Sequence, residues 1–209
     1  MLFRSGRELL RLPHIGPVES VQFDDRGERL LTVSYRDYQQ GPFHARVFDV
    51  ATGKPLGSIT DHARFIVAAR ISKDGRFVAS NGDPGFVRLW DAATGSELAR
   101  IPSSRVRDLE FAPDSASLAL ADSEGRVRLF AVPSGELLAE NRHAKAVHSV
   151  RFDRAGNRLL TASADQTARL WSVHAKNPLL TEAQVLIGHG NEVAAAAFDP
   201  EGQRSEEHT

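Results

Sequence analysis

The 209-residue chain contains no cysteine. This absence excludes disulfide bridges, thiolate metal sites and a cysteine nucleophile. The sequence also lacks any apolar run close to the roughly 20 residues that a membrane-spanning helix needs. Near the start, Arg4, Arg7 and Arg11 interrupt the apolar core that a signal peptide would require. We therefore expect no membrane partner, and we expect the protein to be cytoplasmic.

An excess of one charge is missing as well. The 26 basic and 27 acidic residues leave a formal net charge of −1. Since no overall field attracts nucleic acid, we expect no nucleic-acid partner. Lysine is scarce, with 4 residues against 22 arginines. We interpret this bias as the codon usage of a GC-rich, bacterial genome and not as a sign of an arginine-dependent function.

What the sequence does contain is a pattern that recurs five times without a gap. From His143, the residues four, nine and thirteen positions further on are Val147, Phe152 and Gly156. The same offsets lead to similar residues from every other starting point. The five starting residues, which lie 48, 40, 41 and 46 residues apart, are His14, His62, Pro102, His143 and His189. This constant register indicates a repeat protein.

Each copy is predicted to contain four strands. The segment 147–152 alternates between two faces with a period of two, which is typical of a β-strand. Turn-forming residues follow, and then further strand-like segments. These are predicted at 29–34, 76–80 and 158–163 for the second strand, at 44–48, 86–90, 126–130 and 167–171 for the third, and at 97–101 for a fourth. Four antiparallel strands per copy form one blade of a β-propeller, so the predicted fold class is all-β.

Two motifs identify the family that this pattern resembles. Third strands end in an aromatic residue followed by an acid, as in Trp90-Asp91. In the last complete copy, four polar or aromatic residues occupy characteristic positions, namely His143, Thr161, Asp165 and Trp171. The chain resembles the WD40 repeat family, in which such residues form a hydrogen-bonded tetrad inside each blade. The resemblance implies an arc of four-stranded antiparallel blades of a WD40-like β-propeller.

The tetrad is expected to be less complete in the other copies. The second copy has His62, Ser80 and Trp90 at the matching offsets, but Pro84 stands in place of the acid, and we expect Asp83 to substitute for it. The first copy keeps His14 and Thr32 but has Phe48 in place of tryptophan. In the third copy the matching residues are Pro102, Leu120, Glu124 and Phe130, so no tetrad is expected.

The register divides the chain into seven segments. They are an outer strand of a preceding blade at 1–13, four complete blades at 14–61, 62–101, 102–142 and 143–188, the first strand of a fifth blade at 189–203, and a tail at 204–209. The tail matches the translation of a common sequencing adapter, and we interpret it as an artefact. We expect the chain to be a fragment whose partners include the neighbouring blades of the missing propeller. With its blade faces uncovered, it should oligomerise or aggregate.

Several chemical functions are not supported by the residue pattern. Four of the eight histidines share one repeat position, which puts them on different blades, so we expect no metal and no cofactor. Arginines 46, 88, 128 and 169 each precede the aromatic residue of their blade by two positions and are expected to stack on it. The first residues of the inner strands (Val18, Ile66, Val106, Val147 and Val193) are apolar. We therefore expect no catalytic residues and no enzymatic activity.

The expected function is protein–protein interaction through a non-catalytic scaffold. In this family, partners dock on the loops before the first strand and after the second. The partner-binding candidates at these positions are Tyr35, Arg36, Tyr38, Arg64, Phe65, Arg105, Lys145 and Asn191, and the expected partner is a protein or a peptide. An alternative is a regulatory or docking arm of a larger bacterial enzyme, such as a serine/threonine kinase, a caspase-like protease or an NTPase.

Overall fold

A computed structural model describes most of the chain. The residues it describes are 2–4, 7–14, 16–35, 43–59, 66, 68–82, 85–103, 105–173, 180–188, 190–199 and 205–208. Within this part, every regular element is a β-strand, and no helix is long and apolar enough to cross a membrane. The predicted all-β class is therefore confirmed.

Sixteen of the strands form four antiparallel sheets, which we call blades 1 to 4. Blade 1 consists of β3 (Val18–Phe23), β4 (Arg29–Tyr35), β5 (Phe43–Asp49) and β6 (Pro55–Ile59). Blade 2 consists of β7 (Ala68–Ile71), β8 (Phe77–Asn81), β9 (Phe86–Asp91) and β10 (Glu97–Pro102). Blade 3 consists of β11 (Val106–Phe111), β12 (Ser117–Asp122), β13 (Arg126–Ala131) and β14 (Leu137–Arg142). Blade 4 consists of β15 (Val147–Phe152), β16 (Arg158–Ser163), β17 (Ala168–Val173) and β18 (Leu180–Leu186).

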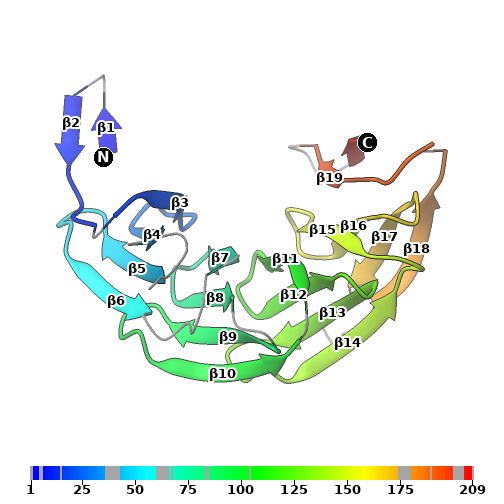
Figure 1. The fold of residues 1–209 in the computed structure, drawn as a ribbon, viewed down its shortest axis with the longest axis horizontal. Helices are drawn as coiled ribbons and strands as arrows, with labels where there is room; N and C mark the ends of the chain where they lie inside the picture. The colour runs from blue at the N-terminus through cyan, green and yellow to red at the C-terminus, as the bar shows by residue number, and fades with distance from the viewer. Residues whose placement is uncertain are drawn as a thin grey trace.

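The blades stand side by side in an open arc (Figure 1). In each blade the strands are paired in chain order, and the first strands, β3, β7, β11 and β15, line the inside of the arc. The fourth strands lie on the outside. The strands predicted from the sequence agree with these elements to within two residues at each end.

The turn between the first and second strands requires an unusual backbone conformation. Gly27, Gly75 and Gly156 have positive φ angles of 67°, 76° and 73° at this point. Glycine adopts this region without a steric penalty. Blade 3 has Ser115 at the same position with a φ of 61°, and its hydroxyl accepts a hydrogen bond from the Asp74 N–H of blade 2 at 3.1 Å. This contact between blades compensates for the less favourable residue.

Each hydrophobic core is shared between two neighbouring blades. The core between blades 1 and 2 contains Leu31, Val33, Ala45, Val47 and Ile59 from blade 1 and Ile66, Ala69, Ile71, Val78 and Trp90 from the next repeat. Equivalent cores lie between blades 2 and 3 and between blades 3 and 4. A single blade buries its apolar faces only against its neighbours, so the stability of the arc depends on these shared cores.

The inner face of blade 1 is exposed at positions that are covered in the other blades. Val21 and Phe23 are 62% and 43% exposed, whereas their repeat equivalents in blade 4, Val150 and Phe152, are 0% and 9% exposed. The residue types are the same, and only the neighbouring blade is different. An apolar strand surface is therefore open to solvent at this end of the arc.

Two smaller antiparallel sheets lie at the ends of the chain. β1 (Leu2–Arg4) pairs with β2 (Arg7–Leu10), and β19 (Ala195–Phe198) pairs with β20 (Ser205–His208). The segment β20 belongs to the tail at 204–209 that we interpret as an artefact, yet it occupies the place of a second strand beside β19. Ladder hydrogen bonds use only backbone groups, so a polar segment can form them without the hydrophobic pair that the repeat has elsewhere. Its interpretation as an adapter artefact stays a prediction.

We expect the isolated chain to self-associate through the open face of β3. A variant with Val21→Ser and Phe23→Ser should show a smaller mass than the wild type at the same concentration, because less apolar surface is available for association. Light scattering coupled to gel filtration measures this mass.

A matched control for this prediction replaces two exposed leucines of the outer strands, Leu98→Ser and Leu137→Ser. The control should associate like the wild type. A wild-type chain that elutes as a sharp monomer and melts cooperatively would contradict the prediction.

Candidate functional site

The four tetrad residues of blade 4 lie in one hydrogen-bonded chain. His143 Nε2 lies 2.8 Å from Thr161 Oγ1, and His143 Nδ1 lies 3.0 Å from Asp165 Oδ2. The Trp171 Nε1–H donates to the same Thr161 Oγ1 at 2.8 Å. Because the carboxylate accepts from Nδ1, the Thr161 hydroxyl donates to Nε2 while it accepts from the indole. The chain links β17, β16, the loop before β15 and the turn after β16.

Burial and hydrogen bonding set the charge state of this tetrad. Burial lowers the pKa of His143, even though the neighbouring Asp165 opposes the shift, so the ring is neutral at pH 7. Burial alone would raise the pKa of Asp165. The Thr167 hydroxyl, the His143 ring and the Ala144 N–H outweigh that effect and lower the pKa to about 2. Asp165 is therefore an anion that organises the donors around it.

Blade 1 keeps half of this arrangement. His14 Nε2 lies 2.9 Å from Thr32 Oγ1, and His14 Nδ1 lies 3.0 Å from the Leu12 carbonyl oxygen. That carbonyl takes the place of the missing acid. Phe48 has no N–H to donate, and its ring packs against the His14 ring at a centroid distance of 5.5 Å.

Blade 2 keeps the bond between the second and third strands. The Trp90 Nε1–H donates to Ser80 Oγ at 2.7 Å, and both side chains are buried. The other two predicted members, His62 and Asp83, lie outside the described residues. The substitution of Asp83 for the usual acid stays a prediction.

Blade 3 has a different polar network where a tetrad is absent. The buried Arg128 donates to the Pro102 carbonyl oxygen at 3.0 Å, to Ser103 Oγ, and to Asp122 Oδ2 at 3.3 Å. Arg126 Nε donates to the same Asp122 Oδ2 at 2.7 Å. The network ties the loop before β11 to the second and third strands, as the tetrad does in blade 4. This network was not predicted from the sequence. The available signal was an acid, Asp122, at the repeat position where blades 1 and 4 have Ser34 and Ser163.

The arginines that precede the blade aromatics stack on them. The distances from the guanidinium carbon to the ring centre are 5.6 Å for Arg88 over Trp90, 5.5 Å for Arg128 over Phe130 and 5.9 Å for Arg169 over Trp171. The stacking prediction is confirmed for these three. Arg46 of blade 1 donates to the Pro13 carbonyl oxygen at 3.4 Å. These side chains reinforce the blades.

The partner-binding candidates that the structure describes lie at one end of the blades. Arg105, Lys145 and Asn191 are exposed in the loops before β11, β15 and β19. Tyr35 ends β4, is half-buried, and packs against the core between blades 1 and 2. The other candidates, Arg36, Tyr38, Arg64 and Phe65, lie outside the described residues.

The same backbone hydrogen bond supports these loops in three blades. It joins the last residue of the second strand, or the residue after it, to the loop before the first strand. The pairs are Tyr35 N to Pro17 O at 3.3 Å, Ser123 N to Arg105 O at 3.1 Å, and Ala164 N to Ala146 O at 2.9 Å. The two loops on which partners are expected to dock are therefore fixed to each other.

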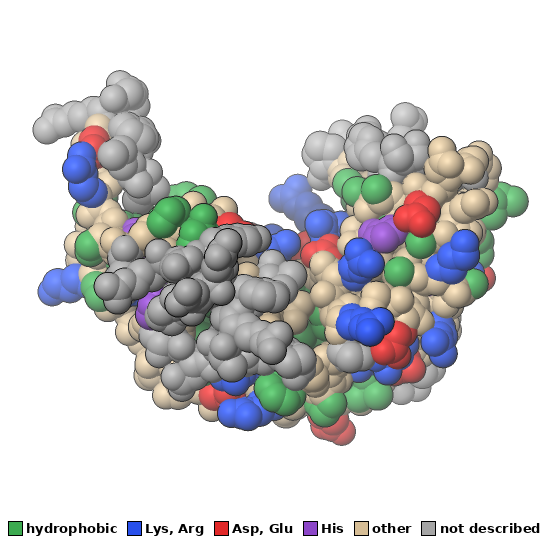
Figure 2. All heavy atoms as spheres, viewed as in Figure 1, with side chains coloured by type: hydrophobic (Ala, Val, Ile, Leu, Met, Phe, Trp, Pro, Cys, Tyr) green, Lys and Arg blue, Asp and Glu red, His purple; other side chains and the backbone are tan. Residues whose placement is uncertain are grey.

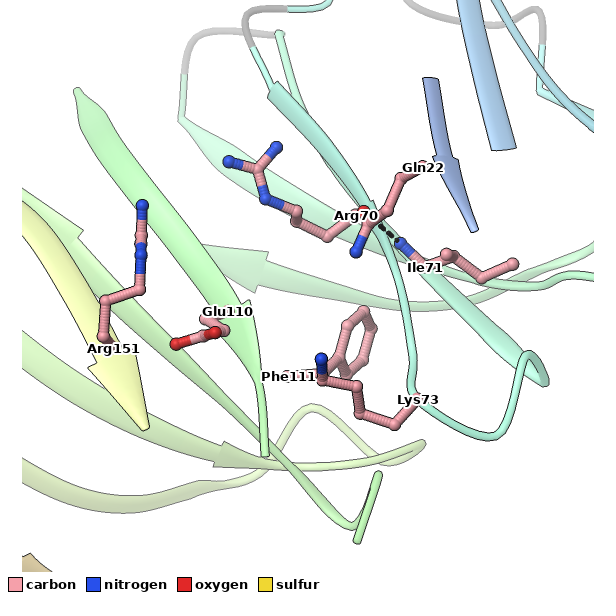
Figure 3. A pocket seen from close by; sticks show the side chains of 7 residues that line it. All are labelled: Gln22, Arg70, Ile71, Lys73, Glu110, Phe111 and Arg151. Carbon is pink, nitrogen blue, oxygen red and sulfur yellow. Dashed lines mark hydrogen bonds between the residues drawn. The ribbon is translucent and has the colours of Figure 1, made fainter. Parts of the chain in front are cut away.

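Polar side chains also gather on the inner strands, where the apolar first residues led us to expect no cluster of catalytic groups. Gln22, Arg70, Glu110 and Arg151 occupy one repeat position on β3, β7, β11 and β15. Together with Ile71, Lys73 and Phe111 they line a cavity of about 140 Å³ (Figure 3). The first residues of the inner strands are apolar as predicted, but these positions lie further along the strands. Their common register was the signal that could have revealed them.

Two of these side chains connect neighbouring blades. Gln22 Oε1 accepts a hydrogen bond from the Ile71 N–H of blade 2 at 3.2 Å. Glu110 Oε2 accepts one from the Phe152 N–H of blade 4 at 2.7 Å, and burial raises the pKa of Glu110. Among the described residues, no group of three histidines or acids could hold a metal ion.

Comparison with known proteins agrees with this geometry. A family model described as WD domain, G-beta repeat matches residues 53–91 and 135–172. The chain contains WD40 repeats. The two matched segments include the third strands of blades 2 and 4, with Trp90 and Trp171.

The curated relatives of these WD40 repeats are longer proteins. Nuclear distribution protein PAC1 from Arthroderma otae is 28% identical over 158 residues, which cover 76% of this chain and 30% of the relative. Actin-interacting protein 1 from Drosophila melanogaster is 26% identical over 170 residues, covering 78% and 27%. Apoptotic protease-activating factor 1 from Danio rerio is 34% identical over 114 residues, covering 50% and 9%. The chain spans less than a third of the length of these relatives.

We expect Thr161→Val to destabilise the protein by about 2–4 kcal/mol, because it leaves the buried Trp171 N–H without an acceptor and His143 without its donor. Thr32→Val is the matched control in blade 1, where only the His14 bond is lost, and it should cost about 1 kcal/mol. Urea unfolding at neutral pH measures both values. Equal losses would show that the tetrad of blade 4 contributes nothing beyond a single hydrogen bond.

The depressed pKa of Asp165 predicts a loss of stability in acid. An aspartate with a folded-state pKa of about 2, against an ordinary value of 3.8, stabilises the fold above the ordinary value. That contribution, up to about 2 kcal/mol, disappears as the pH falls through the folded-state pKa. In Asp165→Asn the free energy of unfolding should therefore fall less steeply below about pH 4 than in the wild type. Urea midpoints across this pH range test the slope, and parallel curves would contradict the assignment.

Proposed function

We propose that this chain is part of a non-catalytic scaffold that binds other proteins through the loop end of its WD40 blades. The observation that carries the proposal is the repeated backbone bond between the loop before the first strand and the end of the second strand. It fixes the backbone at Arg105 in blade 3 and at Ala146, the residue after Lys145, in blade 4, and the side chains of Arg105 and Lys145 are exposed there. A surface that is rigid before binding loses little conformational freedom when a partner docks.

The surface chemistry also suits a protein partner. In Figure 2 basic and acidic side chains are interspersed over the visible face, without a continuous area of one charge. Mixed charge of this kind favours specific docking over nonspecific attraction to a polyanion. One relative, actin-interacting protein 1, is itself named for an interaction with another protein.

We further propose that blades 1 to 4 are four complete blades of a larger ring. The exposed Val21 and Phe23 of blade 1 support this extension, because their equivalents in later blades are covered by a preceding blade. The strand pairs β1–β2 and β19–β20 would then belong to the adjoining blades. A bacterial source rests on the arginine bias alone.

Charge reversal on the loop end tests the proposed function. A variant with Arg105→Glu, Lys145→Glu and Asn191→Glu should retain proteins from an extract of the source organism about tenfold less than the wild type, since each change alters the docking surface. Quantitative mass spectrometry of proteins bound to the immobilised full chain gives the ratio.

The matched control places the same number of glutamates in turns at the opposite end of the blades, as Ala51→Glu, Ala93→Glu and Arg154→Glu. The control should bind like the wild type, and both variants should keep the wild-type melting temperature. Equal retention by the two variants would show that partners do not dock on the loop end.

A further inference from the structure

The inner strands of the arc are joined by a repeated contact between a side chain and the backbone. The accepting side chain belongs to the repeat position that Gln22 and Glu110 occupy. The donor is a backbone N–H of the next blade, from the residue one repeat position later. In this way Gln22 bonds Ile71 between blades 1 and 2, and Glu110 bonds Phe152 between blades 3 and 4. Both side chains have an oxygen that accepts.

Between blades 2 and 3 this contact is missing because the acceptor has been replaced. Arg70 stands at the position of Gln22 and Glu110, and a guanidinium group has only donors. Phe111 of blade 3 is the repeat equivalent of Phe152 in blade 4. Each pairs with a leucine of its second strand, Phe111 with Leu118 and Phe152 with Leu159. The Phe111 N–H therefore points toward blade 2, where no side chain at the matching position can accept it.

The cavity lies at this junction. It is lined by Arg70 and Lys73 of the blade 2 repeat and by Phe111 of blade 3. In Figure 3 the side chain of Arg70 extends from β7 toward the side on which Glu110 and Arg151 lie. The cavity has a volume of about 140 Å³, which is room for several water molecules, since each takes about 30 Å³ in the liquid. The site thus combines backbone and cationic donors with room for an acidic group.

Three acidic residues lie near these cations. Lys73 Nζ lies 3.2 Å from Asp25 Oδ1 at the exposed edge of the site, and the other two acids are engaged toward blade 4. Asp108 accepts from the Val150 N–H at 3.2 Å and forms an ion pair with Arg151. Glu110 accepts from the Phe152 N–H. Arg70 contacts Asp108 only at 3.6 Å and donates to the Ala69 carbonyl at 3.1 Å, which uses part of its five donors.

We propose that the junction between blades 2 and 3 binds the carboxylate of an acidic side chain on a protein partner. This carboxylate takes the acceptor position that Gln22 and Glu110 fill at the other junctions, where it accepts from the Phe111 N–H and pairs with Arg70 and Lys73. The proposal rests on the proposed scaffold function and names the chemistry of one partner contact.

The test uses two fluorescein-labelled peptides of alternating glycine with glutamate or with glutamine, titrated with the full chain at low salt. The glutamate peptide should bind about tenfold more tightly, because only a carboxylate pairs with the cations. Acetate is the competitor that distinguishes the source of the carboxylate. If acetate displaced the peptide at concentrations near the peptide's own Kd, the site would be one for a free small carboxylate, and the protein-partner assignment would be overturned.

The decisive variant is Arg70→Gln. Glutamine at this position can accept from the Phe111 N–H as Gln22 accepts from Ile71, so the melting temperature should stay at or above that of the wild type. The preference for the glutamate peptide should fall about tenfold. Arg100→Gln removes the same charge from the outer strand of the same blade and should leave the preference unchanged.

Unchanged binding by Arg70→Gln, or an equal loss in Arg100→Gln, would overturn the proposal. If only the carboxylate site is wrong, the variant with Arg105→Glu, Lys145→Glu and Asn191→Glu should still retain fewer partner proteins than the wild type. If the scaffold function is wrong, this variant and the control at the opposite end of the blades should retain the same amount of protein. The two failures are therefore distinguishable.

Discussion

The structure depends on the sharing of each hydrophobic core between two blades. A four-stranded sheet of this size has two apolar faces, and neither can be buried within the sheet itself. Ile71 of β7 and Trp90 of β9 lie in one core with Val33 and Val47 of the preceding blade. The exposed Val21 shows the same residue position without that neighbour. The blade interface therefore acts as the repeating unit of stability, and the arc is the form that its repetition takes.

Polar networks fix the loops of blades 3 and 4 relative to these cores. In blade 4 the tetrad joins the loop before β15 to the buried Trp171, and in blade 3 the Arg128 network does the same with different chemistry. Both solutions pair most of the buried donors and acceptors at the same place in the blade, because an unsatisfied group there would cost more than the bond contributes. In blade 3 the buried Arg128 Nε is left without a hydrogen-bond partner, so the link between loop and strands is retained where the motif is lost, but with one donor unpaired.

The inner strands add a third kind of contact, in which a side-chain oxygen of one blade accepts a backbone N–H of the next. Where Arg70 replaces the acceptor, the contact is lost and a cavity with basic residues takes its place. A position that joins blades elsewhere in the arc thus becomes available to a ligand at one junction. In the scaffold that we propose, the loops form one docking surface and the cavity at this junction forms a second one inside the arc.

The sequence by itself determined the repeat register, the strand positions and the tetrad partners of blade 4, because a period of two and a fixed repeat length follow from local geometry. It also indicated which loops share an end of the blades. The Arg128 network and the recess around Arg70 were decided by the tertiary structure. Their residues are far apart in the chain, and their contacts exist only once neighbouring blades are packed. The exposure of Val21 was decided in the same way, since burial at a repeated position depends on the adjoining blade and not on the residue itself.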